Sequence, residues 1–119
     1  MPDGCVLVID DDPEIREMMD AVLTKSGFVV VTAADGDEGL RLVRSERPAL
    51  IFLDIHMPVT DGAAFREAQR RDAELIRIPT VVMTAADGEP LLDLAVAETL
   101  RKPARLNDLL RIARRYCAR

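Results

Sequence analysis

Cysteine, histidine and aromatic residues are scarce in this sequence. Its 119 residues include two cysteines, one histidine, three phenylalanines, one tyrosine and no tryptophan. Cys5 and Cys117 are too few for a disulfide framework and lack the spacing of a zinc site. We therefore expect both to be buried thiols. The chain is long enough for one domain whose hydrophobic core needs no covalent cross-links.

Long apolar runs and excess positive charge are also absent. No run approaches the roughly 18 residues of a membrane span, and the N-terminal residues 1–4 do not resemble a signal peptide. We expect a cytoplasmic protein that does not contact the membrane. The net charge of −5 argues against direct nucleic acid binding, which requires a positive field. Lysine occurs only twice, at Lys25 and at Lys102, which directly precedes Pro103.

Short apolar runs alternate with segments of helical periodicity. The runs predict strands at 5–9, 28–31, 49–53, 80–83 and 98–100. Helices are predicted from Pro13 to a cap at Gly27, over 36–46 and 62–72, in a short segment at 87–97, and from 106 onward. In the first helix an apolar stripe of Ile15, Met18, Met19, Val22 and Leu23 should face the sheet. Five alternations predict an α/β fold with a doubly wound, five-stranded parallel sheet and about five helices.

Polar residues stand where four of the predicted strands end. Asp10 and Asp11, followed by Asp12, end the first strand, Asp54 the third, and Thr84 the fourth, while Lys102 follows the fifth. Parallel strands bring their carboxyl ends to one edge of a sheet, so these side chains should meet in one crevice. Two or three carboxylates with one ammonium leave excess negative charge, which a hard divalent ion such as Mg²⁺ neutralises better than Ca²⁺ with its larger oxygen shell.

Each residue alone also permits a purely structural interpretation. Asp54 could merely end a strand, and the three aspartates could cap a helix. Thr84 could be structural, and Lys102 a solvated loop lysine. Their joint occurrence at the ends of four strands favours a chemical site.

These motifs resemble the receiver domains of response regulators in two-component signalling. The resemblance covers essentially the whole chain, as one receiver domain over 1–119. It is carried by Val6–Asp11, by Leu53–Pro58 with Asp61-Gly62, by Met83-Thr84-Ala85 and by Lys102-Pro103. It implies the flavodoxin-like strand order 2-1-3-4-5 and a cis peptide bond between Lys102 and Pro103. The fourth helical region, between Thr84 and Lys102, is about one turn shorter than is usual.

The resemblance also implies a role for each site residue. Asp54 would be the phosphoacceptor, taking a phosphoryl group from a phosphohistidine of a sensor histidine kinase or phosphotransfer protein. Asp10, Asp11, Asp54 and the backbone carbonyl of His56 would bind Mg²⁺. Thr84 would hydrogen-bond the phosphoryl group, and Lys102 would pair with it. The protein would then be a signalling module with only self-directed phosphoryl transfer and autodephosphorylation, acting on a downstream protein that the sequence does not identify.

Three departures from the family pattern concern the output of the signal. Thr99 stands where many receivers carry an aromatic residue, Ala104 stands where Phe is frequent, and the 84–102 segment is short. We therefore expect an unusual output surface. His56, two residues after the acceptor, occupies a position that influences the lifetime of the phosphoryl group, whereas its ring is a less favoured metal ligand.

Two other functions remain open. The chain could be a receiver-like interaction module that works without phosphorylation, although the complete set of acids with Thr84 and Lys102 argues against it. It could also be a Mg²⁺-dependent phosphatase with an aspartyl nucleophile, but such an enzyme would need a second aspartate where His56 stands. Whether these residues form a stand-alone regulator or part of a longer chain is not determined by the sequence.

Overall fold

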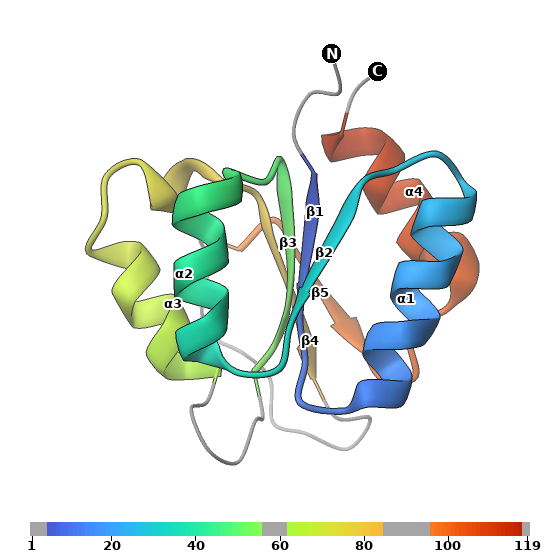
Figure 1. The fold of residues 1–119 in the computed structure, drawn as a ribbon, viewed down its shortest axis with the longest axis horizontal. Coiled ribbons are helices and arrows are strands. Elements are labelled where there is room, and N and C mark those ends of the chain that lie inside the picture. The colour runs from blue at the N-terminus through green and yellow to red at the C-terminus, as the bar shows by residue number, and fades with distance from the viewer. Residues whose placement is uncertain (1–4, 56–61, 85–95, 118–119) are drawn as a thin grey trace.

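The computed structural model describes residues 5–55, 62–84 and 96–117. These residues form alternating strands and helices (Figure 1). In chain order the elements are β1 (Val6–Ile9), α1 (Pro13–Lys25), β2 (Val30–Ala33), α2 (Gly36–Glu46), β3 (Leu50–Asp54), α3 (Gly62–Arg70), the 3₁₀ helix η1 (Leu75–Arg77), β4 (Thr80–Thr84), β5 (Glu98–Arg101) and α4 (Leu106–Tyr116).

The five strands form one parallel sheet in the order β2-β1-β3-β4-β5. Helices α1 and α4 cover one face, and α2 and α3 cover the other (Figure 1). This arrangement confirms the predicted doubly wound α/β fold with the flavodoxin-like strand order. Successive strands are added on one side of β1 and then, from β3 onward, on its other side. Ligands of such sheets bind at the carboxyl edge of this switch point between β1 and β3.

The three central strands are buried on both faces. All residues of β1, β3 and β4 are buried, which explains why their sequences are continuous apolar runs. Successive side chains alternate between two core clusters, as the pleat requires. Val6, Val8 and Phe52 pack with α1 and α4, whereas Leu7 and Leu53 pack on the side of α2 and α3. Each carboxyl end of these strands is thus held rigidly.

Two helices begin at the aspartates that the sequence indicates. Asp12 caps α1 by accepting a hydrogen bond from the backbone N–H of Glu14, with Pro13 in the first turn. Asp35 caps α2 by accepting from the N–H of Glu38. Because Asp12 follows β1 so closely, its cap places the first turn of α1 beside the carboxyl edge of the sheet.

Several boundaries and side chains differ from the sequence-based prediction. Strand β2 begins at Val30 rather than at Phe28, because Phe28 packs into the core of α1 and α4 before the strand starts. Helix α3 ends at Arg70 rather than at Asp72, whose carboxylate instead accepts the backbone N–H groups of Glu74 and Leu75 and turns the chain.

Met18 also departs from expectation, because it is 41% exposed instead of lying with the rest of the apolar stripe of α1.

Other predictions are confirmed or lie outside the described residues. Cys5 and Cys117 are both buried, and Gly27 adopts the positive φ of 97° expected of a helix cap. The helix expected over 87–97 lies outside the described residues except for its last two, which are not helical. The described residues contain four α-helices and one 3₁₀ helix. None of these helices is both long enough and apolar enough to span a bilayer.

Candidate functional site

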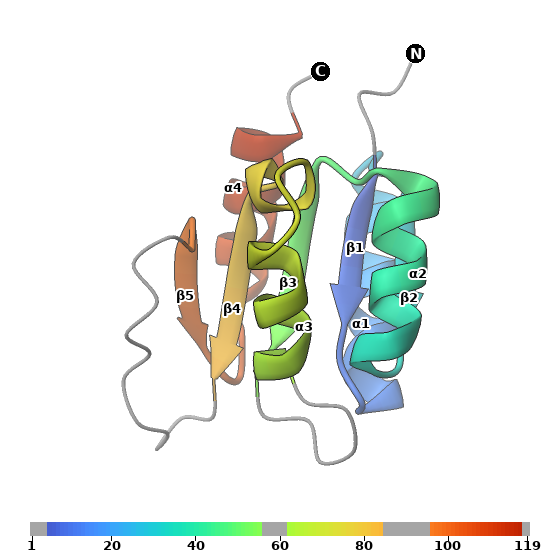
Figure 2. The ribbon, with the colours of Figure 1, turned by 90° about the vertical axis from the view of Figure 1, so that its left-hand side faces the viewer.

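Three carboxylates meet at the carboxyl edge of the sheet. Asp10 directly follows β1, and Asp54 is the last residue of the neighbouring strand β3. The carboxylate oxygens of Asp10, Asp11 and Asp54 lie within 4.8 Å of one another. Figure 2 shows the arrowheads of β1, β4 and β5 pointing to this same edge. Asp10 and Asp54 are buried, with 0% and 3% of their surface exposed, whereas Asp11 is exposed.

Lys102 bridges the two buried carboxylates. Its Nζ lies 2.9 Å from Oδ2 of Asp10 and 3.2 Å from Oδ2 of Asp54, and 24% of its side chain is exposed. The backbone N–H of Lys102 donates to the carbonyl of Thr84 at 2.8 Å, which ties the start of the 102–105 loop to the end of β4. The peptide bond to Pro103 is cis, as the resemblance implies. One of only two lysines thus lies at the centre of the acidic cluster.

Thr84 is the fourth strand-end residue, at the carboxyl end of β4. Its side chain is buried, with 4% of the residue exposed. Strand β4 pairs with β3, placing Asp54 opposite Met83, so Thr84 stands one residue further toward the edge. The structure therefore brings Asp10, Asp11, Asp54, Thr84 and Lys102 to one edge of the sheet, as predicted. His56 lies outside the described residues.

The electrostatics of the site reflect crowded negative charge. Burial raises the pKa of the Asp10 carboxyl, and the charge of Asp54 adds to this effect, while hydrogen bonds from the Asp12 N–H and Lys102 oppose it. For Lys102, burial alone would lower the pKa, but the hydrogen bond to Asp10 and the charges of both carboxylates outweigh burial and raise it. Lys102 is therefore a cation at neutral pH, facing three acids.

The donor set fits a magnesium ion. Carboxylate oxygens are the ligands that Mg²⁺ prefers, and Mg²⁺ keeps several waters rather than a closed protein cage. Three carboxylates against one ammonium leave net negative charge for a divalent cation to neutralise. Asp11 lies on the exposed side of the cluster, where a hydrated ion can approach.

Two residues support the site in ways that the sequence alone did not reveal. The guanidinium of Arg16 donates from Nη1 to the backbone carbonyl of Asp10 at 2.7 Å. Gly62, which the sequence predicts as the start of a helix, lies against the end of β3: a Cβ atom there would clash with the carbonyl oxygen of Asp54 and lie 2.6 Å from Cα of Ile55. In the sequence, Arg16 is recognisable only as an arginine near the start of a predicted helix, and Gly62 only as a glycine that follows an aspartate at the start of another. Neither pattern predicts a contact with the site.

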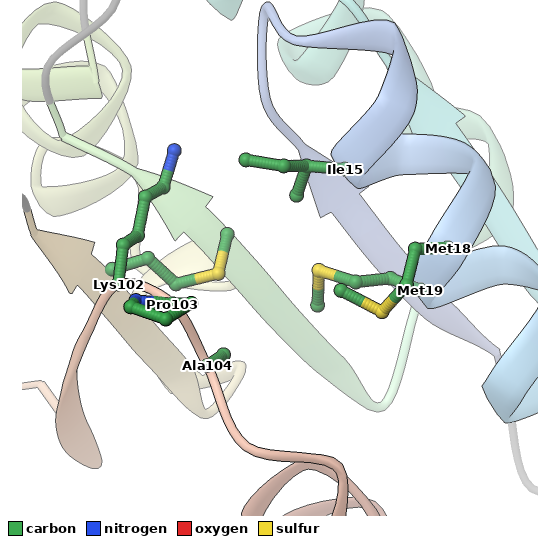
Figure 3. A pocket seen from close by; sticks show the side chains of 7 residues that line it. Ile15, Met18, Met19, Lys102, Pro103 and Ala104 are labelled. Atoms are coloured by element: carbon green, nitrogen blue, oxygen red, sulfur yellow. The ribbon is translucent and has the colours of Figure 1, made fainter.

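The residues that depart from the family pattern lie on two surfaces. Thr99 is exposed on β5, a strand joined to α4 by the ion pair of Glu98 with Arg111 at 3.1 Å. Ala104 instead lines a small, mainly apolar pocket between α1 and the loop after β5 (Figure 3). The pocket is lined by Ile15, Met18, Met19, Met83, Lys102, Pro103 and Ala104. The small side chain of Ala104 leaves this space beside Lys102.

The fold and the site define a class of protein: a flavodoxin-like α/β domain with an acidic, lysine-bridged site at its topological switch point. Comparison with known proteins then identifies the family. The model of the response regulator receiver domain matches residues 6–114. The chain belongs to the response regulator receiver domain family.

Individual relatives agree with this assignment. The chain is 30% identical to the Vibrio cholerae chemotaxis protein CheY4, with a TM-score of 0.83 over 95% of this chain and 98% of that chain. It is 29% identical to a sensor protein from Polaromonas sp. JS666, with a TM-score of 0.86 over 98% and 97% of the two chains. It is also 36% identical to ycf27 of Cyanophora paradoxa over 89% of this chain.

The curated relatives are longer than this chain. The match spans 48% of ycf27. The Streptomyces coelicolor transcriptional regulatory protein AfsQ1, 39% identical over 71% of this chain, is covered over 36% of its length. The chain thus spans about half or less of these relatives.

Proposed function

We propose that this receiver domain accepts a phosphoryl group on Asp54 from a phosphohistidine of a histidine kinase or phosphotransfer protein. The observation that carries the proposal is the contact of Lys102 with both Asp10 and Asp54 inside a cluster of three carboxylates. Lysine and carboxylates are arranged here around one strand end, where an incoming phosphoryl group would meet a nucleophile and a cation together.

In the proposed reaction an oxygen of the Asp54 carboxylate attacks the phosphorus atom. The P–N bond of the donor breaks, its electron pair remains on the imidazole nitrogen, and an acyl phosphate forms on Asp54. Mg²⁺, held by Asp10, Asp11, Asp54 and the backbone carbonyl of His56, would supply positive charge to the phosphoryl oxygens. Burial of Asp54 restricts the directions from which a donor can approach.

Lys102 and Thr84 would stabilise the product. Lys102 Nζ lies 3.2 Å from Oδ2 of Asp54, so the ammonium is already next to the oxygen that would join the phosphoryl group. Phosphorylation moves negative charge outward, and the flexible lysine can follow it. The hydroxyl of Thr84 would donate a hydrogen bond to a phosphoryl oxygen and so couple the charge to the end of β4.

The phosphorylated state would alter a surface that binds a downstream protein. AfsQ1 is a transcriptional regulatory protein of which this chain matches only part, so the negatively charged domain itself need not contact nucleic acid. We propose only self-directed phosphoryl transfer and autodephosphorylation as its chemistry. The extent of the domain over residues 1–119 and a cytoplasmic location stay predictions.

Treatment with acetyl phosphate and MgCl₂, followed by intact-mass measurement, tests the proposal. The wild-type protein should gain one phosphoryl group and lose it on standing, and Asp54→Asn should gain none. If the wild type gains no mass with acetyl phosphate or with a phosphorylated kinase, the phosphorylation-independent interaction module is favoured instead. Sustained turnover of small phosphate esters would favour the Mg²⁺-dependent phosphatase.

A further inference from the structure

The carboxylates of Asp10 and Asp11 converge although the two residues are adjacent in sequence. In an extended strand, successive side chains point to opposite faces. Here the Asp10 side chain is fully buried and that of Asp11 is exposed, yet their oxygens lie within 4.8 Å of each other and of Asp54. The backbone must therefore leave the strand conformation at this point, and Asp11 indeed lies in a bend.

The carbonyl of Asp10 lies beyond the last paired residue of β1. The N–H of Asp10 still donates to the carbonyl of Ala33 at 3.1 Å, but the paired residues of β1 end at Ile9. The carbonyl of Asp10 thus needs a donor from elsewhere. Arg16 Nη1 supplies it at 2.7 Å, a length typical of a charge-assisted hydrogen bond.

Helix α1 holds this turn at a second point. The N–H of Asp12 donates to Oδ1 of Asp10 at 2.9 Å, and the side chain of Asp12 in turn caps α1. The side chain of Arg16 and the cap residue therefore fix the main chain and the carboxylate of Asp10 from the same helix. Lys102 contacts the carboxylates themselves, whereas the hydrogen bond of Arg16 goes to the backbone.

We propose that Arg16 is a positioning residue for divalent cation binding, because its guanidinium holds the Asp10 carbonyl and thereby orients the carboxylates of Asp10 and Asp11. This inference rests on the proposed function, since it concerns the Mg²⁺ of the same site. A group that fixes a metal ligand from outside the coordination shell commonly changes metal affinity 10- to 100-fold when removed.

Positioning and simple electrostatics predict opposite results. A positive charge near the site repels a divalent cation, so removing Arg16 would strengthen Mg²⁺ binding if charge alone mattered. If positioning dominates, removal weakens binding. Lysine retains the charge but lacks the planar fork of the guanidinium, and should restore the affinity only in part.

The test compares Arg16→Met and Arg16→Lys with the wild type and with Arg41→Met, a matched charge change at an exposed position of α2. MgCl₂ is titrated into the full 119-residue protein, and backbone amide NMR shifts give the Mg²⁺ dissociation constant. Thermal melting without metal is measured in parallel. We expect affinity to fall about 10-fold or more in Arg16→Met, less in Arg16→Lys, and to stay unchanged in Arg41→Met.

The possible results distinguish a failure of the positioning role of Arg16 from a failure of the proposed function. Unchanged or tighter Mg²⁺ binding by a folded Arg16→Met variant would overturn the positioning role, even if its melting temperature fell. If Arg16→Met does not fold, Arg16→Lys decides: wild-type affinity there overturns the inference, and weakened affinity supports it. A wild-type protein that shows no saturable Mg²⁺ binding contradicts the proposed function and this inference with it.

Discussion

At the scale of single residues, Asp10 and Lys102 determine the charge balance of the site. Asp10 is fully buried and Lys102 touches both buried carboxylates. The two groups have opposite effects on the metal-free protein: burial destabilises the charged form of Asp10, whereas its carboxylate partners stabilise the charged form of Lys102. Replacing each one separately should therefore change stability in opposite directions.

For Asp10→Asn we expect a more stable metal-free protein near neutral pH. Because the folded-state pKa of Asp10 is raised above its ordinary value of 3.8, the folded state binds the proton more readily than the unfolded chain. This contribution to stability is present at low pH and is lost as pH rises through the raised pKa. Urea unfolding with EDTA from about pH 4 to about pH 8 should show the wild type losing stability relative to Asp10→Asn. Parallel profiles for the two proteins would contradict the prediction.

For Lys102→Gln we expect a loss of stability. The substitution leaves Asp10 and Asp54 buried without their ammonium partner, which should lower the free energy of unfolding by roughly 1–3 kcal/mol, less than for a fully buried pair. Since the folded-state pKa of Lys102 is raised from 10.5, its stabilisation is complete at neutral pH and is lost only as pH rises through the raised value.

The matched control is Lys25→Gln, at the exposed C-terminal end of α1, which should change stability by no more than about 0.5 kcal/mol. Denaturant unfolding without metal measures both variants. Equal effects of the two lysine substitutions would show that the contacts of Lys102 with the carboxylates contribute nothing.

At the scale of elements, the start of α3 and the end of β3 must approach each other closely. Gly62 begins α3 against the carbonyl of Asp54, so the helix rests directly on the backbone of the proposed phosphoacceptor. Gly39 in α2 makes a similar approach, but its neighbours there are the side chains of Ile9 and Phe65. The backbone atoms beside Gly62 cannot move aside for an added Cβ atom as readily as the side-chain atoms beside Gly39.

We therefore expect Gly62→Ala to lower stability by about 1–3 kcal/mol and to impair phosphorylation of Asp54, because either α3 or the end of β3 must shift. Gly39→Ala is the matched control: the Cδ1 atom of Ile9, 2.6 Å from the added Cβ, ends a flexible side chain. The gain of about 1 kcal/mol in helix propensity should offset much of that clash. Thermal unfolding and acetyl phosphate labelling of both variants measure the difference. A Gly62→Ala protein with wild-type labelling would show that this approach is not required.

At the same scale, strand β5 contacts helix α4 through an ion pair. Thr99, which we expect to stand where many receivers carry an aromatic residue, is exposed on β5, and the strand is joined to α4 through Glu98 and Arg111. That ion pair is half-exposed on the arginine side, with 51% of the side chain accessible, so it contributes little to stability. We predict that the unusual output surface expected from Thr99 includes β5 and α4.

At the scale of the whole molecule, metal binding at the acidic cluster would be linked to folding. A cation that binds the folded site and not the unfolded chain stabilises the protein by mass action, by about 2.7 kcal/mol at 100 times its dissociation constant. For a domain of this size that corresponds to a rise in Tm of roughly 10 °C.

We expect MgCl₂ to raise the melting temperature, and EDTA to reverse the rise. NaCl at matched ionic strength should have a much smaller effect, since screening does not replace a bound divalent ion. The rise should shrink in Asp54→Asn, which removes a proposed ligand. Equal stabilisation by NaCl and MgCl₂ would exclude a specific site.

The architecture and the location of the site could be predicted from local sequence patterns. Buried parallel strands must be continuously apolar, so 5–9, 49–53 and 80–83 were recognisable, and aspartates before helices marked their starts. Because all parallel strands have their carboxyl ends at one edge, the sequence alone grouped Asp10, Asp11, Asp54, Thr84 and Lys102. Their chemical roles stay predictions, since geometry alone does not test them.

The contacts between side chains at the site follow from the packing of the helices on the sheet and could not be predicted from the sequence. The bridge from Lys102 to both Asp10 and Asp54, the hydrogen bond of Arg16 to a carbonyl, and the contact of Gly62 with β3 join residues that no local pattern relates. The start of β2 at Val30 and the exposure of Met18 were likewise set by packing. Periodicity and caps report the local backbone, whereas these contacts depend on how helices settle on the sheet.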